Sequence, residues 1–228
     1  RRYDLREAVE LLGETPRTLS ARGHALLEAG KIKAGLKDLE TARANSKGAL
    51  RYLYELVDAY MEHGKPEQAI KTLKVEAGLL SQLPSYHVTL GDAYRMQKKL
   101  DKADAEYEKA LKLYEDYPEA LLGRGLVAYE KKDYDKATEW FEKAVGARSK
   151  FPEVYVAVGT MWIDQGYTDQ AHTQLDHAEK LYFAQGADRR TMEKFYDKVI
   201  KAFSKSRRTA SFAKQWIERR DKYRKGEL

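Results

Sequence analysis

Histidine, serine and acidic side chains are the groups that could support catalysis or metal binding, because the chain has no cysteine. His172 and His177 are five residues apart, which places them on different faces of a helix. A helical zinc site uses a four-residue spacing, which puts both ligands on one face. No nucleophile motif surrounds a serine, and no Gly-rich phosphate loop occurs. The sequence therefore predicts a non-enzymatic protein without a metal or cofactor.

The prolines define the elements on which these residues lie. Pro16, Pro84, Pro118 and Pro152 are separated by multiples of 34 residues. This period divides the chain, without insertion or deletion, into five repeats: 16–49, 50–83, 84–117, 118–151 and 152–185. A recurring period of this length is typical of a repeat array, in which neighbouring units bury a continuous core.

The apolar pattern within each repeat predicts two antiparallel helices. Small residues recur at the eighth and twentieth places, and large apolar residues at the fourth, eleventh and twenty-fourth, which are helical offsets. Small side chains let two helices cross closely. We expect Gly30, Gly64 and Gly166 to end first helices in a left-handed conformation, and Asp133 to cap a second helix.

These columns resemble the tetratricopeptide repeat (TPR) family. The resemblance is clearest in Leu90-Gly91-Asp92-Ala93-Tyr94 with Ala103, Tyr107 and Ala110, and in Gly125 with Asp133-Tyr134, Ala137, Phe141 and Ala144. It implies an all-α fold, a right-handed α-solenoid superhelix of antiparallel helical hairpins with five full repeats, a half repeat and capping helices. The departures from the pattern are Arg22, Arg124, His87, Glu76 and Ala128.

The two ends of the chain lie outside the five repeats. Residues 1–15 fit the second helix of a truncated repeat, and the chain starts without methionine, so we expect that either processing or excision from a larger protein has set its N-terminus. Residues 186–228 predict a capping helix, with Asp188 as its N-cap, and a basic amphipathic helix. This segment carries fourteen Lys and Arg against six Asp and Glu, although the whole chain has a net charge of only +6. Its candidate binding cations are Arg207, Arg208, Lys214, Arg219 and Arg220.

The resemblance also implies that the first helices line a concave groove. Their outward places are the second, fifth, ninth, twelfth and thirteenth of each repeat. In the last two repeats these places form an apolar strip, which suggests a binding surface, with acids around it. We expect a partner-binding groove made of Arg51, Tyr54, Asp58, Met61, Arg95, Met96, Glu119, Leu122, Leu126, Tyr129, Glu130, Val156, Thr160 and Ile163, with Glu153 and Asp164 on its rim.

The predicted function is a scaffold or adaptor that binds a peptide segment or helix in this groove. The partner would carry apolar anchors and some basic residues. The chaperone-binding carboxylate clamp of some family members is disfavoured, because the one asparagine, Asn45, is not on a first helix. The alternatives are a self-assembling module, or an anchor to an acidic partner or membrane surface through the basic helix; nucleic acid is not expected. The lack of cysteine, signal peptide and membrane span favours a cytoplasmic location.

Overall fold

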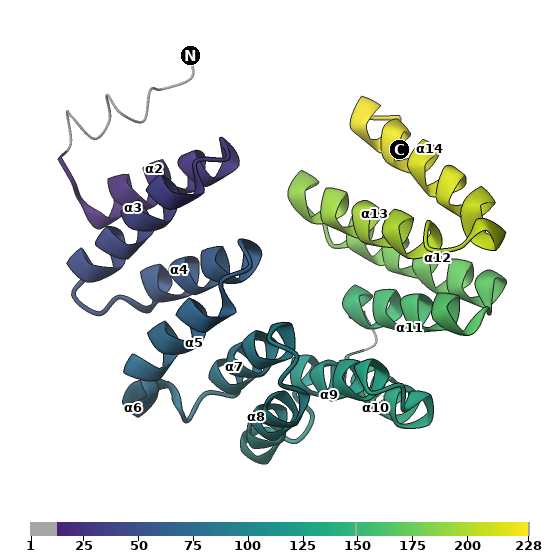
Figure 1. Cartoon of the computed structure of the whole chain (residues 1–228), viewed down its shortest axis with the longest axis horizontal. Coiled ribbons are helices and arrows are strands. Elements are labelled where there is room, and N and C mark those ends of the chain that lie inside the picture. Colours follow the sequence, from purple (N-terminus) through teal and green to yellow (C-terminus); the bar gives the residue numbers. More distant parts are fainter. Residues whose placement is uncertain (1–12, 149, 228) are drawn as a thin grey trace. The chain divides into compact units, whose positions relative to one another are not determined.

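A computed structural model of the chain describes residues 13–148 and 150–227. Its helices form two compact units that divide between Leu113 and Tyr114 (Figure 1). The described residues contain no β-strand, and the predicted all-α fold of helical hairpins is confirmed in each unit. The truncated repeat predicted for residues 1–15 falls mostly on residues 1–12, which lie outside the described residues.

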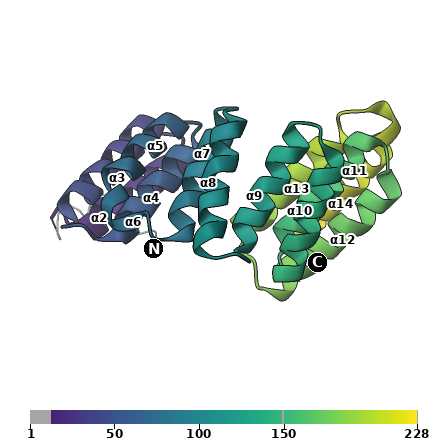
Figure 2. The ribbon, with the colours of Figure 1, turned by 90° about the horizontal axis from the view of Figure 1, so that it is seen from below.

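The described residues of the first unit form three hairpins. Its helices are α2 (Pro16–Glu28), α3 (Ile32–Asn45), α4 (Leu50–Glu62), α5 (Pro66–Val75), α6 (Ala77–Leu80), α7 (Pro84–Met96) and α8 (Leu100–Leu113). The first helix of each repeat packs beside its own second helix (Figure 2). The second repeat differs from the others, because its second helix ends at Val75 and resumes as the short α6.

The second unit also holds three hairpins. Its helices are α9 (Pro118–Glu130), α10 (Tyr134–Ala147), α11 (Pro152–Gln165), α12 (Thr168–Ala184), α13 (Arg189–Phe203), the 3-10 turn η1 (Arg207–Thr209) and α14 (Ala210–Lys225). The last hairpin, α13 with α14, follows the fifth repeat but does not keep the 34-residue frame. Asp188 caps α13 by accepting a hydrogen bond from the backbone N–H of Thr191.

The turns between paired helices share one backbone conformation. The fifteenth place of every repeat has a positive φ, at Gly30, Gly64, Lys98, Lys132 and Gly166. Glycine adopts this left-handed conformation without the steric cost that a side chain brings. Lys98 and Lys132 keep this left-handed conformation because their turns form the same backbone hydrogen bond as the glycine turns. In the third repeat, for example, the N–H of Lys99 donates to the carbonyl oxygen of Tyr94 (3.0 Å).

Close helix crossings explain the small-residue columns. A Cβ added to Gly125 on α9 would lie 2.4 Å from the ring of Phe141 on α10, and one on Gly91 would lie 2.6 Å from the ring of Tyr107. Both distances are far below van der Waals contact, so the helices of each pair can approach only because these residues are glycines.

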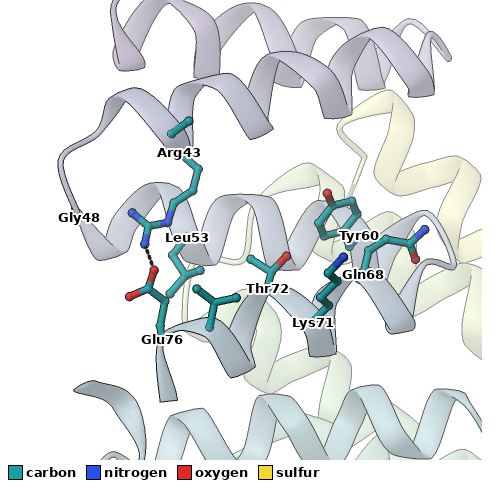
Figure 3. A pocket seen from close by; sticks show the side chains of 10 residues that line it. Arg43, Gly48, Leu53, Tyr60, Gln68, Lys71, Thr72 and Glu76 are labelled. Carbon is teal, nitrogen blue, oxygen red and sulfur yellow. Dashed lines mark hydrogen bonds and ion pairs between the residues drawn. The ribbon is translucent and has the colours of Figure 1, made fainter. Parts of the chain in front are cut away.

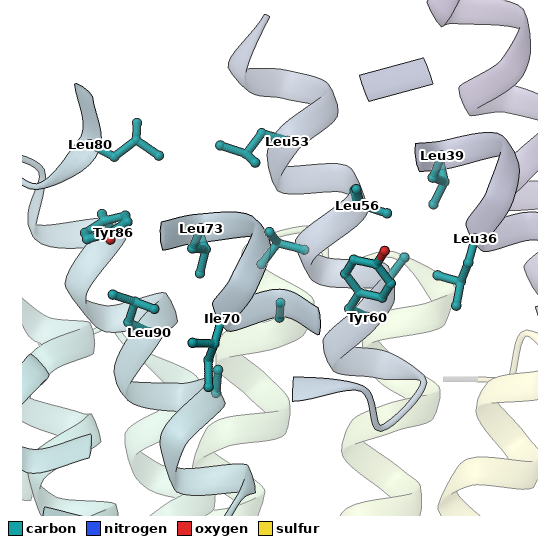
Figure 4. Packing of buried hydrophobic residues seen from close by; sticks show 14 residues of the cluster. Leu36, Leu39, Leu53, Leu56, Tyr60, Ile70, Leu73, Leu80, Tyr86 and Leu90 are labelled. Carbon is teal, nitrogen blue, oxygen red and sulfur yellow. The ribbon is translucent and has the colours of Figure 1, made fainter. Parts of the chain in front are cut away.

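The core of the first unit runs between successive hairpins. Leu36 and Leu39 of α3, Leu53 and Tyr60 of α4, and Leu73 of α5 belong to one buried cluster, whose side chains lie between successive helices in Figure 4. Each large apolar column therefore packs both within its own hairpin and against the next. This packing makes each repeat dependent on its neighbour for a complete core.

The polar departures from the repeat pattern have partners inside the fold. Arg22 makes a bidentate ion pair with Asp38 at 2.5 and 2.8 Å, and the guanidinium of Arg124 lies 4.3 Å from the ring centre of Trp140. His87 is buried, with Nδ1 2.7 Å from Glu106. Buried polar groups are tolerated where such partners exist.

Candidate partner-binding surfaces

The apolar strip predicted on the fourth and fifth repeats is mostly internal. Val156 and Ile163 of α11 are buried in one cluster with Met192, Phe195 and Val199 of α13. The prediction that these two residues face a partner is therefore wrong, because the helix after the fifth repeat covers them. On α9, Leu122 is 9% exposed, while Leu126 and Tyr129 are half-buried.

The acids around this strip are engaged by the chain itself. Glu119 pairs with Arg148 at 3.1 Å, and Asp164 pairs with Lys205 at 2.9 Å. The hydroxyl of Tyr129 also donates to Asp164. Three of the expected residues remain. Glu130 is half-buried, Glu153 is exposed and lies within hydrogen-bonding reach of Tyr182, and Thr160 donates its hydroxyl to Val156 O within α11 (2.7 Å). The negative rim is thus largely compensated, which weakens the expected preference for basic residues in a partner.

The first helices of the first unit present a more open surface. Arg51 on α4 has a side chain that is 73% exposed, and Met96 at the end of α7 is 41% exposed. Asp58 is exposed, and Tyr54, Met61 and Arg95 are half-buried. The Tyr54 hydroxyl is buried and has no hydrogen-bond partner among the described residues. Apolar and polar side chains therefore alternate on this surface, and no other helix among residues 13–113 covers it.

A polar cluster fixes α2 against α4 beside this surface. Ser20, which is buried, donates to Glu55 at 2.5 Å, and Arg51 donates to the other oxygen of the same carboxylate at 2.6 Å. Burial acts to raise the pKa of Glu55, but these two hydrogen bonds outweigh it and hold the pKa below its ordinary value. Glu55 is thus a charged link between two first helices.

The basic tail divides into paired and exposed cations. Arg219 pairs with Asp176 and with the buried Glu179 (3.2 Å), and Arg220 pairs with Asp197 (3.0 Å). These two arginines, expected as binding cations, hold α14 against α12 and α13. Trp216 of α14 is fully buried. The exposed cations of the predicted set are Arg207, Arg208 and Lys214.

A pocket that the repeat pattern did not predict opens where the second repeat departs from that pattern. The pocket has a volume of about 690 Å³ and lies between the end of α3, α4 and α5 (Figure 3). Glu76 occupies a place that is alanine in the other repeats; it ends α5 and pairs with Arg43. Leu53 and Tyr60 line the pocket, and Val75 beside it is 77% exposed. The replacement of alanine by Glu76 in this column is the sequence signal that could have predicted the opening.

The described part of the chain offers neither a metal site nor a membrane-spanning helix. Within residues 13–148 and 150–227, no three histidine or acidic side chains are grouped so that they could hold a metal ion. None of the described helices combines the length and the apolar character that crossing a membrane requires.

Comparison with known proteins identifies the repeat. A sequence profile of the tetratricopeptide repeat matches residues 20–84 and 88–150, more than half of the chain. No curated protein sequence matches the chain significantly.

Solved structures share the fold at low sequence identity. The thermophilic TPR protein TTC0263 of Thermus thermophilus is 20% identical, with a TM-score of 0.62 over 81% of this chain and 99% of that one. A chain of the APC/C hetero-tetramer Cut9–Hcn1 is 15% identical, with a TM-score of 0.63 over 93% of this chain and 45% of that one. PilF of Pseudomonas aeruginosa is 19% identical, with a TM-score of 0.53 over 90% of both chains.

Proposed function

The chain belongs to the tetratricopeptide repeat family, and on this premise we propose that it holds a partner protein by a peptide segment lying along its first helices. The family's fold is that of a protein–protein interaction scaffold, and its members are generally non-enzymatic. The Cut9–Hcn1 structure, whose chain resembles this one in fold, is itself an assembly of several chains. The proposal concerns where the partner binds and which side chains it contacts.

The exposure of Arg51 and Met96 on α4 and α7 is the observation that carries this proposal. Val156 and Ile163, at the fifth and twelfth places of the fifth repeat, are buried under α13. Tyr54 and Met61, at the same places of the second repeat, are only half-buried, and none of the described helices of the first unit covers Arg51 or Met96. Arg51 lies in the first turn of α4 and Met96 at the end of α7, so a charged and an apolar side chain are presented at different points along the first helices. Together they can give a peptide both buried contact and orientation. The surface of α2, α4 and α7 is therefore the preferred binding site.

Tyr54 adds a specific polar contact to this surface. Its hydroxyl is buried without a partner among the described residues, although a buried hydroxyl is normally hydrogen-bonded. A peptide carbonyl lying over α4 would accept this hydrogen bond. We therefore expect the ligand to be an extended or helical segment with apolar side chains near Met61 and Met96, oriented by one backbone contact at Tyr54. Charge has a smaller part in binding, because Arg51, the exposed cation of this surface, already pairs with Glu55.

Selection of peptides from a random displayed library by the whole chain tests the proposal. Met96→Glu should reduce capture of the selected peptides at least tenfold, because a charge would replace an apolar contact. Leu79→Glu is the matched control, since Leu79 is also an exposed apolar residue of the first unit but lies on the second-helix segment α6. Circular dichroism checks that both variants keep their helical content. Equal capture by the two variants would exclude the first helices as the binding site.

A further inference from the structure

A second pocket of the first unit is surrounded by lysine side chains. It has a volume of about 790 Å³ and is formed by the turn before α5, by α5 itself, and by the turn between α7 and α8. Lys65 and Lys74 line it from the second repeat, and Lys99 and Lys102 from the third. None of these residues occupies an outward place of a first helix, so the pocket is separate from the groove proposed above.

The positive charge of this pocket is not compensated by ion pairs. Among the described residues, Lys65, Lys74, Lys99 and Lys102 form no ion pair, although the charge of Glu106 acts on Lys74 from farther away, and Glu67 is the single acid in the pocket lining. Arg219, Arg220 and Arg224 differ in this respect, because each is paired with an acid of its own unit. Four lysines and one acid line this pocket, so its positive charge is less compensated than that of these three tail arginines.

An aromatic ring orders two of these lysines. The ammonium groups of Lys74 and Lys102 lie 5.8 and 5.9 Å from the ring centre of Tyr94. Cations at this distance are attracted to the face of the ring. Contact with the ring thus restricts both lysine side chains, which lowers the entropic cost of ordering them when an anion binds.

The pocket also contains a hydrogen-bond acceptor without a donor. The side-chain oxygen Oε1 of Gln97 is buried and unpartnered in the described structure. A phosphate ion at neutral pH keeps at least one P–OH group that could donate to this oxygen, but an oxygen used as a donor no longer serves as an acceptor for the lysines. A peptide with several carboxylates offers acceptors to all four lysines and separate backbone N–H donors for Gln97, so it fits the whole pocket lining better than one small anion does.

We propose that this lysine pocket binds an acidic segment of a partner protein, with aspartate or glutamate side chains on the lysines and a backbone N–H on Gln97. The binding is independent of the groove along the first helices, so the chain would contact its partners on two separate surfaces. Because the lysines are largely exposed, the binding weakens as salt concentration rises.

Fluorescence anisotropy of the whole chain with a labelled peptide of eight glutamates tests this proposal. A peptide of eight glutamines should not bind. The double variant Lys99→Gln/Lys102→Gln should raise the Kd of the acidic peptide at least tenfold. Lys222→Gln/Lys225→Gln is the matched control, because it removes the same charge from exposed lysines of α14; its Kd should stay within about twofold of the unmodified chain.

Three results would overturn the proposal. The first is that the peptide of eight glutamates does not bind the chain, or that it binds the two double variants with the same Kd. The second is displacement of the peptide by inorganic phosphate at the same concentration of negative charge, which would make the pocket a simple anion site. The third is a single-stranded DNA of eight nucleotides that binds as tightly as the peptide and depends on the same lysines, which would make the pocket a nucleic-acid site. Circular dichroism of both variants excludes unfolding as a cause.

Discussion

The hydroxyl of Tyr129 on α9 donates a hydrogen bond to the carboxylate of Asp164 on α11, thirty-five residues later. Lys205, just after α13, donates to the same carboxylate at 2.9 Å. Burial and then the hydrogen bond to Asp164 raise the pKa of Tyr129, so the hydroxyl stays a donor at any ordinary pH. One acid thus links the first helices of two successive repeats to the segment that follows the array.

Tyr129→Phe should therefore lower the free energy of unfolding of the second unit by about 1 kcal/mol, the usual net value of such a hydrogen bond. All three tryptophans, Trp140, Trp162 and Trp216, belong to this unit, so tryptophan fluorescence during urea denaturation follows it specifically. Tyr167→Phe is the control, because that side chain is 54% exposed. Equal stability of the two variants would mean that the Tyr129–Asp164 contact adds nothing.

Gly125→Ala should destabilise the second unit by about 1–3 kcal/mol, because the new methyl group would overlap the ring of Phe141. Gly146→Ala on α10 is the opposite case, since nothing lies within 4 Å of the position its Cβ would take. Replacing an open helical glycine should stabilise the unit by up to about 1 kcal/mol. Tryptophan fluorescence measures both, and a shift in the same direction for both variants would contradict the close crossing.

Two tail arginines should differ in their contribution to stability. Burial raises the pKa of Glu179, although the hydrogen bond from Tyr196 and the charge of Arg219 act against this rise. Arg219→Met leaves this buried acid without its cation and should cost about 1.5–3 kcal/mol. Arg224→Met breaks a more exposed pair with Glu193 and should cost about 0–1 kcal/mol.

The double variant Arg219→Met/Glu179→Gln checks the origin of that cost. The glutamine can still accept from Tyr196 but carries no charge to bury, so part of the lost stability should return. If the double variant is no more stable than Arg219→Met alone, the stability lost in Arg219→Met comes from the packing of the arginine over Trp216 and not from the unpaired charge of Glu179.

Acid should remove the stabilisation that Glu55 provides. The pKa of Glu55 is lower in the folded chain than its ordinary value of 4.5, so its contribution is complete above that pH and is lost as pH falls through the folded value. Glu55→Gln should cost about 1 kcal/mol at neutral pH and almost nothing near pH 2. Circular dichroism follows the unfolding of both units, whereas tryptophan fluorescence follows only the second. The difference between the two unfolding curves therefore measures the unfolding of the first unit. A cost independent of pH would exclude the charge as the cause.

The repeat frame was predictable because close packing constrains residue type at every crossing. Pro84, Pro118 and Pro152 each begin a first helix, and Gly30, Gly64 and Gly166 each take the predicted left-handed conformation. The equivalent conformation at Lys98 and Lys132 had no such signal, because their side chains do not prefer it. Local rules therefore identify the frame even where single residues depart from them.

The binding surface was less predictable, because exposure depends on what lies beyond the repeat. Val156 and Ile163 occupy places that are outward within their own repeat, but α13 continues the array and buries them. Arg219 and Arg220 form a basic cluster in sequence, and only the fold brings Asp176 and Asp197 to them. The lysine pocket joins residues of two repeats, so spacing within one repeat could not reveal it.

Photo-crosslinking tests the central claim, that a partner lies along the first helices, most directly. A photoreactive amino acid is placed either at Met96 on α7 or at Leu79 on α6, two exposed positions of the first unit, and each protein is irradiated with a selected peptide. The scaffold account predicts that the peptide crosslinks from position 96 and not from position 79. Crosslinking from position 79 alone, or equally from both, would contradict it.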